Sequence, residues 1–304
     1  MKKQFVVFHA VPVALFIGIV LSFVFAKGIV NAQSITKTVK SAPVIVKTSS
    51  EKSATNSRFL NAATENTKLR SGLAWNFGGR VQNGWEIYEP LIADTLGSNA
   101  NAGSIEFAAA LSKWQASRGL TATGILDEDS LWAMTRYWQS LRLGRSDFPG
   151  DEKLLSAPIA DFYDSTRDVE LLKLERETYA AYKRMIAAAS KDLGREIRFT
   201  RNGELAAGEK YLRIVSAYRS PEYQAELRRK QPGASRAALA VHSPHNTGQA
   251  LDLYVGGEPV STKDLNRLMQ IKTPAYRWLV KNARKYGFVN YFYEPWHWEY
   301  VGNK

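Results

Sequence analysis

An uncharged run of 22 residues near the N-terminus, from Phe5 to Ala26, is the feature that most restricts how this chain can fold. Lys2 and Lys3 precede the run, and the small-residue stretch Val30-Asn31-Ala32 follows it. A basic start, an apolar stretch and a small-residue cleavage site are together typical of an export signal. As a helix the run would measure about 33 Å, enough to cross a bilayer core of about 30 Å. We therefore expect residues 1–32 to be a cleaved signal peptide or an uncleaved anchor in the inner membrane.

The net charge of +12 is concentrated in the N-terminal part of the chain. Residues 1–32 carry +3 and residues 33–70 carry +5, whereas residues 71–304 hold 31 basic and 27 acidic side chains. This near balance gives no support for a nucleic-acid-binding face, so we expect no nucleic-acid partner. The chain has no cysteine, which excludes disulfides, a thiol-linked lipid anchor and thiolate metal ligands.

The 304 residues are enough for two modest domains behind a spacer. Residues 33–70 contain six Ser and six Thr with few large apolar side chains, so we expect a flexible linker over residues 33–74. We expect a helical domain over residues 75–145 and a second domain over residues 146–304.

Two helices are predicted in the first domain. Phe107, Ala110, Leu111 and Trp114 follow helical spacing, and Asp127 can cap a second helix running from Glu128 to Trp138. The same stretch contains Trp114-Gln115, Gly119-Leu120, Thr123-Gly124, Asp127 and Ser130-Leu131. On these residues, the segment over residues 85–140 resembles the small three-helix peptidoglycan-binding domain that is appended to many bacterial wall hydrolases. The resemblance implies that this domain holds the protein on wall glycan.

The second domain begins with a packing helix, predicted over residues 175–193 from its amphipathic pattern. Residues 211–216 alternate like a strand, and Ser220-Pro221-Glu222 is a typical helix start. Arg219 therefore lies at a strand-to-helix junction, a place where loops often present functional groups.

Histidine is rare in this chain, and two of its four histidines stand near carboxylates. His245 precedes a glycine turn and a predicted strand from Gln249 to Val255, on which Asp252 and the small Ala250 share one face. The turn can bring the imidazole of His245 and the carboxylate of Asp252 onto one ion, and Zn²⁺ suits such ligands. A structural hydrogen bond between the two is the alternative.

A third motif, Glu294-Pro295-Trp296-His297, adds a second histidine and a second carboxylate. Pro295 prevents Glu294 and His297 from sharing a helical turn, so we expect Glu294 to end a loop and His297 to begin a strand. Two histidines and one carboxylate would leave a zinc position open for water, and a further carboxylate beside it could act as a base.

The joint pattern resembles the LAS metallopeptidases, which include the zinc D-alanyl-D-alanine carboxypeptidases and dipeptidases of bacterial wall metabolism. It comprises Ser243-x-His245-x-x-Gly248-x-Ala250-x-Asp252 and Glu294-x-Trp296-His297. Together with Ser216-x-Tyr218-Arg219-Ser220, the stretch from Glu294 to Trp298 is most similar to the VanY-like carboxypeptidases. The resemblance covers residues 170–302.

This resemblance implies an α+β fold with a small antiparallel sheet and flanking helices. It implies Zn²⁺ as cofactor, with His245, Asp252 and His297 as ligands and Glu294 as the base that activates the attacking water. Arg219 would pair with the oxyanion or with the terminal carboxylate of the substrate.

We expect an exported enzyme, periplasmic or associated with the cell wall, that removes the terminal D-Ala of peptidoglycan stem peptides. An L-alanyl-D-glutamate endopeptidase of the same family and a non-catalytic wall-binding protein are the alternatives. Ser243 would orient substrate or cap a turn, and Trp296 would line the pocket or the core. The sequence predicts no oligomeric state.

Overall fold

The computed structural model describes residues 49–144, 147–230 and 243–302, with the side chains of residues 49–55 left out. The predicted export segment over residues 5–26 lies outside this part of the chain. Within the described part, no helix is long and apolar enough to cross a membrane.

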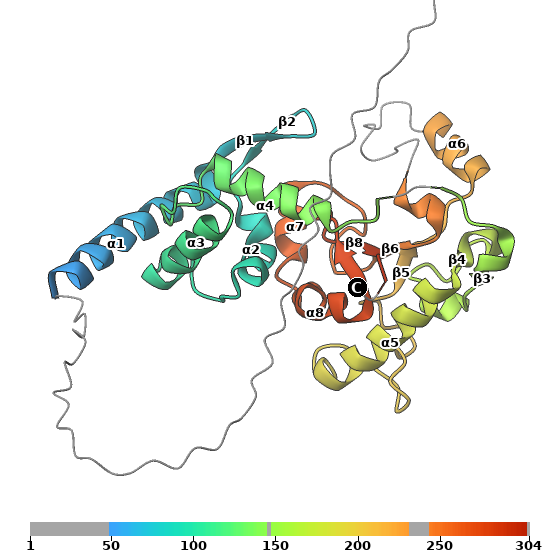
Figure 1. The fold of residues 1–304 in the computed structure, drawn as a ribbon. Coiled ribbons are helices and arrows are strands. Elements are labelled where there is room, and N and C mark those ends of the chain that lie inside the picture. Colours follow the sequence, from blue (N-terminus) through green and yellow to red (C-terminus); the bar gives the residue numbers. More distant parts are fainter. Residues whose placement is uncertain (1–48, 145–146, 231–242, 303–304) are drawn as a thin grey trace, which may run out of the picture. The chain divides into compact units, whose positions relative to one another are not determined.

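The first region is mainly helical and contains one short hairpin (Figure 1). Its elements are α1 (Ser49–Gly72), β1 (Ala74–Phe77), β2 (Arg80–Asn83), η1 (Glu86–Tyr88), α2 (Glu89–Leu96), α3 (Ile105–Ser117) and α4 (Glu128–Ser140). The two helices predicted from the sequence are α3 and α4, and the Asp127 side chain caps α4 by accepting from the Ser130 N–H at 2.9 Å.

The expectation of a flexible linker is wrong for residues 49–72, because these residues form helix α1. Ala62, Ala63 and Asn66 are buried on one side of α1, which packs against α3. The small side chains of this stripe permit close helix contact, although they contribute little to the average hydropathy of the segment. The folded region therefore begins well before residue 75.

Asn66 is the residue that joins α1 to the loop ahead of α4. Its side-chain amide donates to the Gly124 carbonyl at 2.8 Å, and its Oδ1 accepts from the Leu126 N–H at 2.7 Å. Asn66 is fully buried, so these two bonds satisfy main-chain groups that water does not reach.

The second region contains the expected α+β arrangement. Its elements are η2 (Asp151–Lys153), β3 (Leu154–Ser156), η3 (Ile159–Asp161), η4 (Val169–Leu172), β4 (Lys173–Glu175), α5 (Arg176–Asp192), β5 (Ile214–Ser216), α6 (Pro221–Lys230), η5 (Pro244–Thr247), β6 (Ala250–Leu253), α7 (Asp264–Gln270), α8 (Pro274–Asn282), η6 (Ala283–Tyr286), β7 (Phe288–Asn290) and β8 (His297–Tyr300). The main sheet has the order β5-β6-β8-β7 with every neighbouring pair antiparallel. The predicted fold class is thus confirmed.

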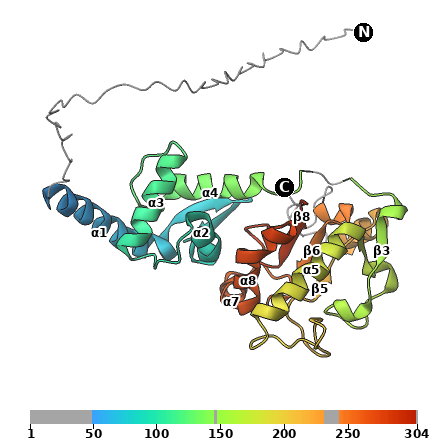
Figure 2. The same ribbon diagram turned by 60° about the horizontal axis from the view of Figure 1, so that its bottom comes forward.

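Helix α5 lies beside β5 and β6 (Figure 1, Figure 2). The Tyr182 hydroxyl on α5 donates to the Leu212 carbonyl at 3.1 Å, which ties the helix to the chain entering β5. Strand β5 begins later than predicted, because Leu212 adopts a left-handed conformation with φ of 66° and turns the chain before Ile214. Strand β6 is likewise shorter than predicted, covering Ala250–Leu253.

The described residues, from 49 to 302, belong to one compact unit. Phe77 of the hairpin packs against Phe292 with ring centroids 4.8 Å apart, and the buried Arg267 of α7 donates to the Tyr88 hydroxyl at 3.4 Å. The division of this unit at residue 145 stays a prediction.

Replacing Asn66 by alanine should destabilise the fold by about 2 kcal/mol, because the Gly124 carbonyl and the Leu126 N–H would lose their buried partners. Urea unfolding followed by circular dichroism measures the change. Asn61→Ala, an exposed substitution on the same helix, is the matched control and should stay within about 0.5 kcal/mol of wild type. Equal stability of the two variants would contradict the role assigned to Asn66.

Candidate active site

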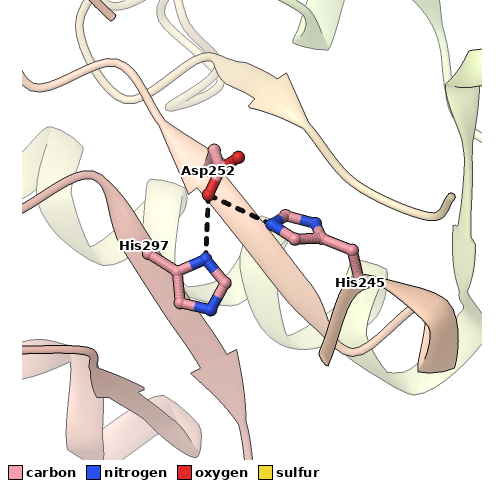
Figure 3. A group of neighbouring side chains, drawn as sticks. All are labelled: His245, Asp252 and His297. Atoms are coloured by element: carbon pink, nitrogen blue, oxygen red, sulfur yellow. Dashed lines mark hydrogen bonds and ion pairs between the residues drawn. The ribbon is translucent and has the colours of Figure 1, made fainter. Parts of the chain in front are cut away.

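Three buried side chains converge on one point of the second region: His245 from η5, Asp252 from β6 and His297 from β8 (Figure 3). Asp252 Oδ1 lies 3.2 Å from His245 Nε2 and 2.9 Å from His297 Nδ1. One ligand atom from each residue lies within 4.8 Å of the others, so the group could hold a metal ion.

Strand register places two of these side chains side by side. Asp252 pairs directly with His297 across β6 and β8, and Ser216 of β5 pairs with Asp252 on its other side. Cross-strand partners project on the same face of a sheet, so the three residues form a row. The opposite face of β6 carries Leu251 and Leu253, which are fully buried in the core.

The third side chain, His245, is placed by a tight turn. Gly248 closes the turn with φ of +71°, a conformation that L side chains rarely adopt. A Cβ atom at this position would also lie 2.9 Å from the Glu175 nitrogen, whose N–H donates to the Gly248 carbonyl. Glycine is therefore required here by both conformation and space.

Hydrogen bonds on the outer side of each ring fix which nitrogen faces Asp252. His245 Nδ1 lies 2.7 Å from the Ala217 carbonyl, which can only accept, so Nδ1 carries the proton. His297 Nε2 lies 3.1 Å from the carboxylate oxygen Oε1 of Glu299. When the rings are neutral, two nitrogen lone pairs and a carboxylate face one another, an arrangement that calls for a cation between them.

The pKa values of His245, His297 and Asp252 are shifted by burial and by the charges of their neighbours. Burial lowers the pKa of His245 to about 4, and the neighbouring Arg219 acts in the same direction. Burial also lowers the pKa of His297, but its bonds to Asp252 and Glu299 outweigh burial and raise the value to about 9. Burial raises the pKa of Asp252, whereas the two imidazoles outweigh it and hold the value well below the usual range.

Glu294 lies within the loop between β7 and β8, which main-chain bonds hold in place. Its N–H donates to the Tyr291 carbonyl at 2.9 Å, and its own carbonyl accepts from the His297 N–H at 2.9 Å. Burial raises the pKa of its carboxyl group, and the charges of the cluster act on it as well. Among the described residues, the Glu294 carboxylate has no hydrogen-bond partner, so it is free to exchange a proton with a bound molecule.

Arg219 reaches the same cluster. Its Nη2 lies 3.3 Å from Asp252 Oδ2 and its Nε lies 3.3 Å from Ser216 Oγ. The Arg219 side chain keeps 15% exposure, whereas that of Asp252 keeps 3%, so the guanidinium forms the more accessible edge of the cluster.

Ser243 and Trp296 lie close to the cluster in sequence, but in the structure both have a structural role. Ser243 Oγ caps η5 by accepting from the His245 N–H at 3.3 Å. Trp296 is 3% exposed within the hydrophobic core, and its carbonyl accepts from the Leu253 N–H at 2.8 Å. Their roles in substrate binding stay predictions.

Two charged residues near the cluster were not predicted from the sequence. Glu299 bonds to His297, and its position two residues along the same strand face could have indicated this. Arg142 bonds to Glu299 from a segment 157 residues earlier, and no local signal connects the two.

Part of this chain matches a known protein family. Residues 171–303 match the family model VanY, described as D-alanyl-D-alanine carboxypeptidase. The chain is 30% identical over 124 residues to a D-alanyl-D-alanine carboxypeptidase of Enterococcus faecium, covering 37% of this chain and 37% of that protein. It is also 30% identical over 149 residues to the putative carboxypeptidase YodJ of Bacillus subtilis (strain 168), covering 43% of this chain and 47% of that protein.

The chain thus spans less than half the length of these two relatives. A solved structure, that of the LdcB LD-carboxypeptidase, is similar with 25% identity and a TM-score of 0.37, covering 54% of this chain and 73% of that one. The family match includes the strands and loops that carry Arg219, His245, Asp252, Glu294 and His297. Residues 171–303 of this chain are thus similar to the VanY family, described as D-alanyl-D-alanine carboxypeptidase.

Proposed function

We propose that this protein is an exported, zinc-dependent D-alanyl-D-alanine carboxypeptidase that hydrolyses the terminal D-Ala of peptidoglycan stem peptides. The observation that carries the proposal is the convergence of His245, Asp252 and His297 within a segment of the VanY family. Export rests on the predicted signal or anchor in residues 1–32, and retention on wall glycan rests on the predicted function of the helical region.

The donor set suits zinc. His245 offers Nε2, His297 offers Nδ1 and Asp252 offers a carboxylate oxygen, a mixed nitrogen and oxygen set typical of catalytic zinc sites. A bound zinc ion supplies Lewis acidity, which makes water easier to deprotonate and a carbonyl easier to attack.

Glu294 is the general base in this proposal. Its raised pKa brings the carboxyl group closer to the working pH, where it can accept a proton from the attacking water and later release it. Protonation of the departing amino group of D-Ala by the same carboxyl completes the hydrolysis of the peptide bond.

Arg219 provides the positive charge that faces the substrate. A guanidinium can bind the terminal carboxylate of the peptide through two parallel hydrogen bonds. It can equally donate to the single anionic oxygen that develops on the carbonyl. Its bond to Asp252 Oδ2 fixes the guanidinium beside the metal ligands in either case.

Replacing Glu294 by alanine should reduce the release of D-alanine from a pentapeptide stem by about 10²- to 10⁴-fold, because the proton acceptor is lost. Mass spectrometry of the products measures the rate, and zinc content is measured in parallel by metal analysis. Zinc content should not change. Glu170→Ala, at an exposed position, is the control and should keep wild-type turnover. Unchanged turnover in Glu294→Ala would remove this residue from the mechanism.

A free carboxylate at the end of the substrate should be required. A pentapeptide with a C-terminal amide should be cleaved more slowly than the free acid, and Arg219→Gln should reduce this preference if the guanidinium binds the carboxylate. A kcat loss in Arg219→Gln with an unchanged preference would assign the residue to the oxyanion instead. Cleavage only between L-Ala and D-Glu would contradict the carboxypeptidase proposal.

Zinc binding should release about one proton at pH 7.5, because the raised pKa of His297 leaves its ring protonated in the metal-free protein. Zinc must displace this proton, so its apparent affinity should rise with pH and level off near the His297 pKa of about 9. Calorimetry in two buffers of different protonation enthalpy measures the proton count. Binding heats that do not depend on the buffer would contradict the prediction.

A further inference from the structure

Arg142 follows helix α4 in the first region, yet its guanidinium contacts a carboxylate at the proposed metal site. We propose that Arg142, acting through Glu299, is a positioning residue for His297, so that the segment after α4 completes the metal centre. This inference rests on the proposed zinc site and adds to it a residue outside the family segment.

Glu299 is the link between the two regions. Its side chain is fully buried, and its Oε1 accepts from Arg142 Nε at 2.9 Å and also from Arg142 Nη2. The same oxygen lies 3.1 Å from His297 Nε2, while Oε2 accepts from the Leu143 N–H at 2.8 Å. Both oxygens are thus occupied, and the carboxylate has a fixed orientation.

The guanidinium of Arg142 is itself held in place. Its Nη1 donates to Gln139 Oε1 at 2.9 Å, and its Cζ lies 4.0 Å above the centre of the Tyr291 ring. Tyr291 in turn donates its N–H to the His297 carbonyl at 3.0 Å, and its ring meets the His297 ring edge-on at 6.0 Å. Arg142 therefore reaches both sides of His297, through a carboxylate and through an aromatic ring.

Two physical reasons connect this arrangement to metal binding. A buried carboxylate is costly without a cation, and among the described residues Arg142 is the arginine or lysine bonded to Glu299. A carboxylate that accepts from the outer nitrogen of a histidine fixes the ring orientation and strengthens the inner nitrogen as a ligand. Loss of Arg142 should therefore make the Glu299 side chain more mobile. The His297 ring, whose Nδ1 faces Asp252, would then be less precisely oriented.

The register of the sheet supports the same reading. Glu299 pairs with Ala250 across β8 and β6, and both residues project on the face that carries Asp252 and His297. The cross-strand neighbour of Glu299 on this face is thus the small methyl side chain of Ala250.

The experiment compares wild type with Arg142→Met and Arg142→Lys in the full chain. Zinc affinity is measured by competition with a chelator, and the visible spectrum of the Co²⁺-substituted protein reports the ligand geometry. We expect Arg142→Met to lose about 10- to 100-fold in zinc affinity and to alter the Co²⁺ spectrum. Arg142→Lys keeps the positive charge but loses the paired N–H donors of the guanidinium. Its zinc affinity should therefore lie between those of Arg142→Met and wild type.

Arg118→Met is the matched control, because Arg118 also lies over aromatic rings of the first region but contacts no part of the metal site. It should leave zinc affinity and the Co²⁺ spectrum unchanged. If Arg142→Met does not fold, Arg142→Lys and Glu299→Gln decide the question by the same two measurements.

Wild-type zinc affinity and an unchanged Co²⁺ spectrum in the folded Arg142 variants would overturn the inference, even if urea unfolding shows lower stability. That result would identify the contact as an ion pair that only stabilises the fold. Absence of zinc binding by the wild-type protein would instead contradict the proposed function, so the two failures are distinguishable.

Discussion

The buried carboxylate of Asp252 is the group on which the site depends. It accepts from Arg219 on one oxygen and lies between two imidazole nitrogens on the other. An uncompensated charge at this depth would be strongly destabilising, so the surrounding elements must keep their cations and donors in place. The antiparallel pairing of β5, β6 and β8 keeps the partners of Asp252 in place, because it sets Ser216, Asp252 and His297 in one row.

Much of this row could be predicted from the sequence, because it follows from short-range patterns. Alternation along residues 250–253 places the leucines inward and Asp252 on the opposite face, and Pro295 separates the loop of Glu294 from the strand of His297. Local chemistry also predicts the caps at Asp127 and Ser243, since each side chain bonds an N–H only two or three residues away. Such signals need no knowledge of distant packing.

The features that were missed depend on contacts far apart in the chain. Helix α1 is polar and Ser-rich on average, and it is held by contacts from distant parts of the chain: packing against α3 and the Asn66 bonds to Gly124 and Leu126. Leu212 alternates like a strand residue, but the left-handed turn that it adopts is imposed by bonds to Tyr182 and Tyr254. The contact between Arg142 and Glu299 spans 157 positions, which no periodicity can reveal.

The bridge made by Asn66 also determines how the chain can be cut into fragments. A fragment that starts at Trp75 would retain the loop over residues 123–126 but not the amide that satisfies its Gly124 carbonyl and Leu126 N–H. That loop leads into α4, and α4 leads directly to Arg142. Removal of α1 would therefore act on a loop that lies five elements further along the chain, so a truncated protein should retain Asn66.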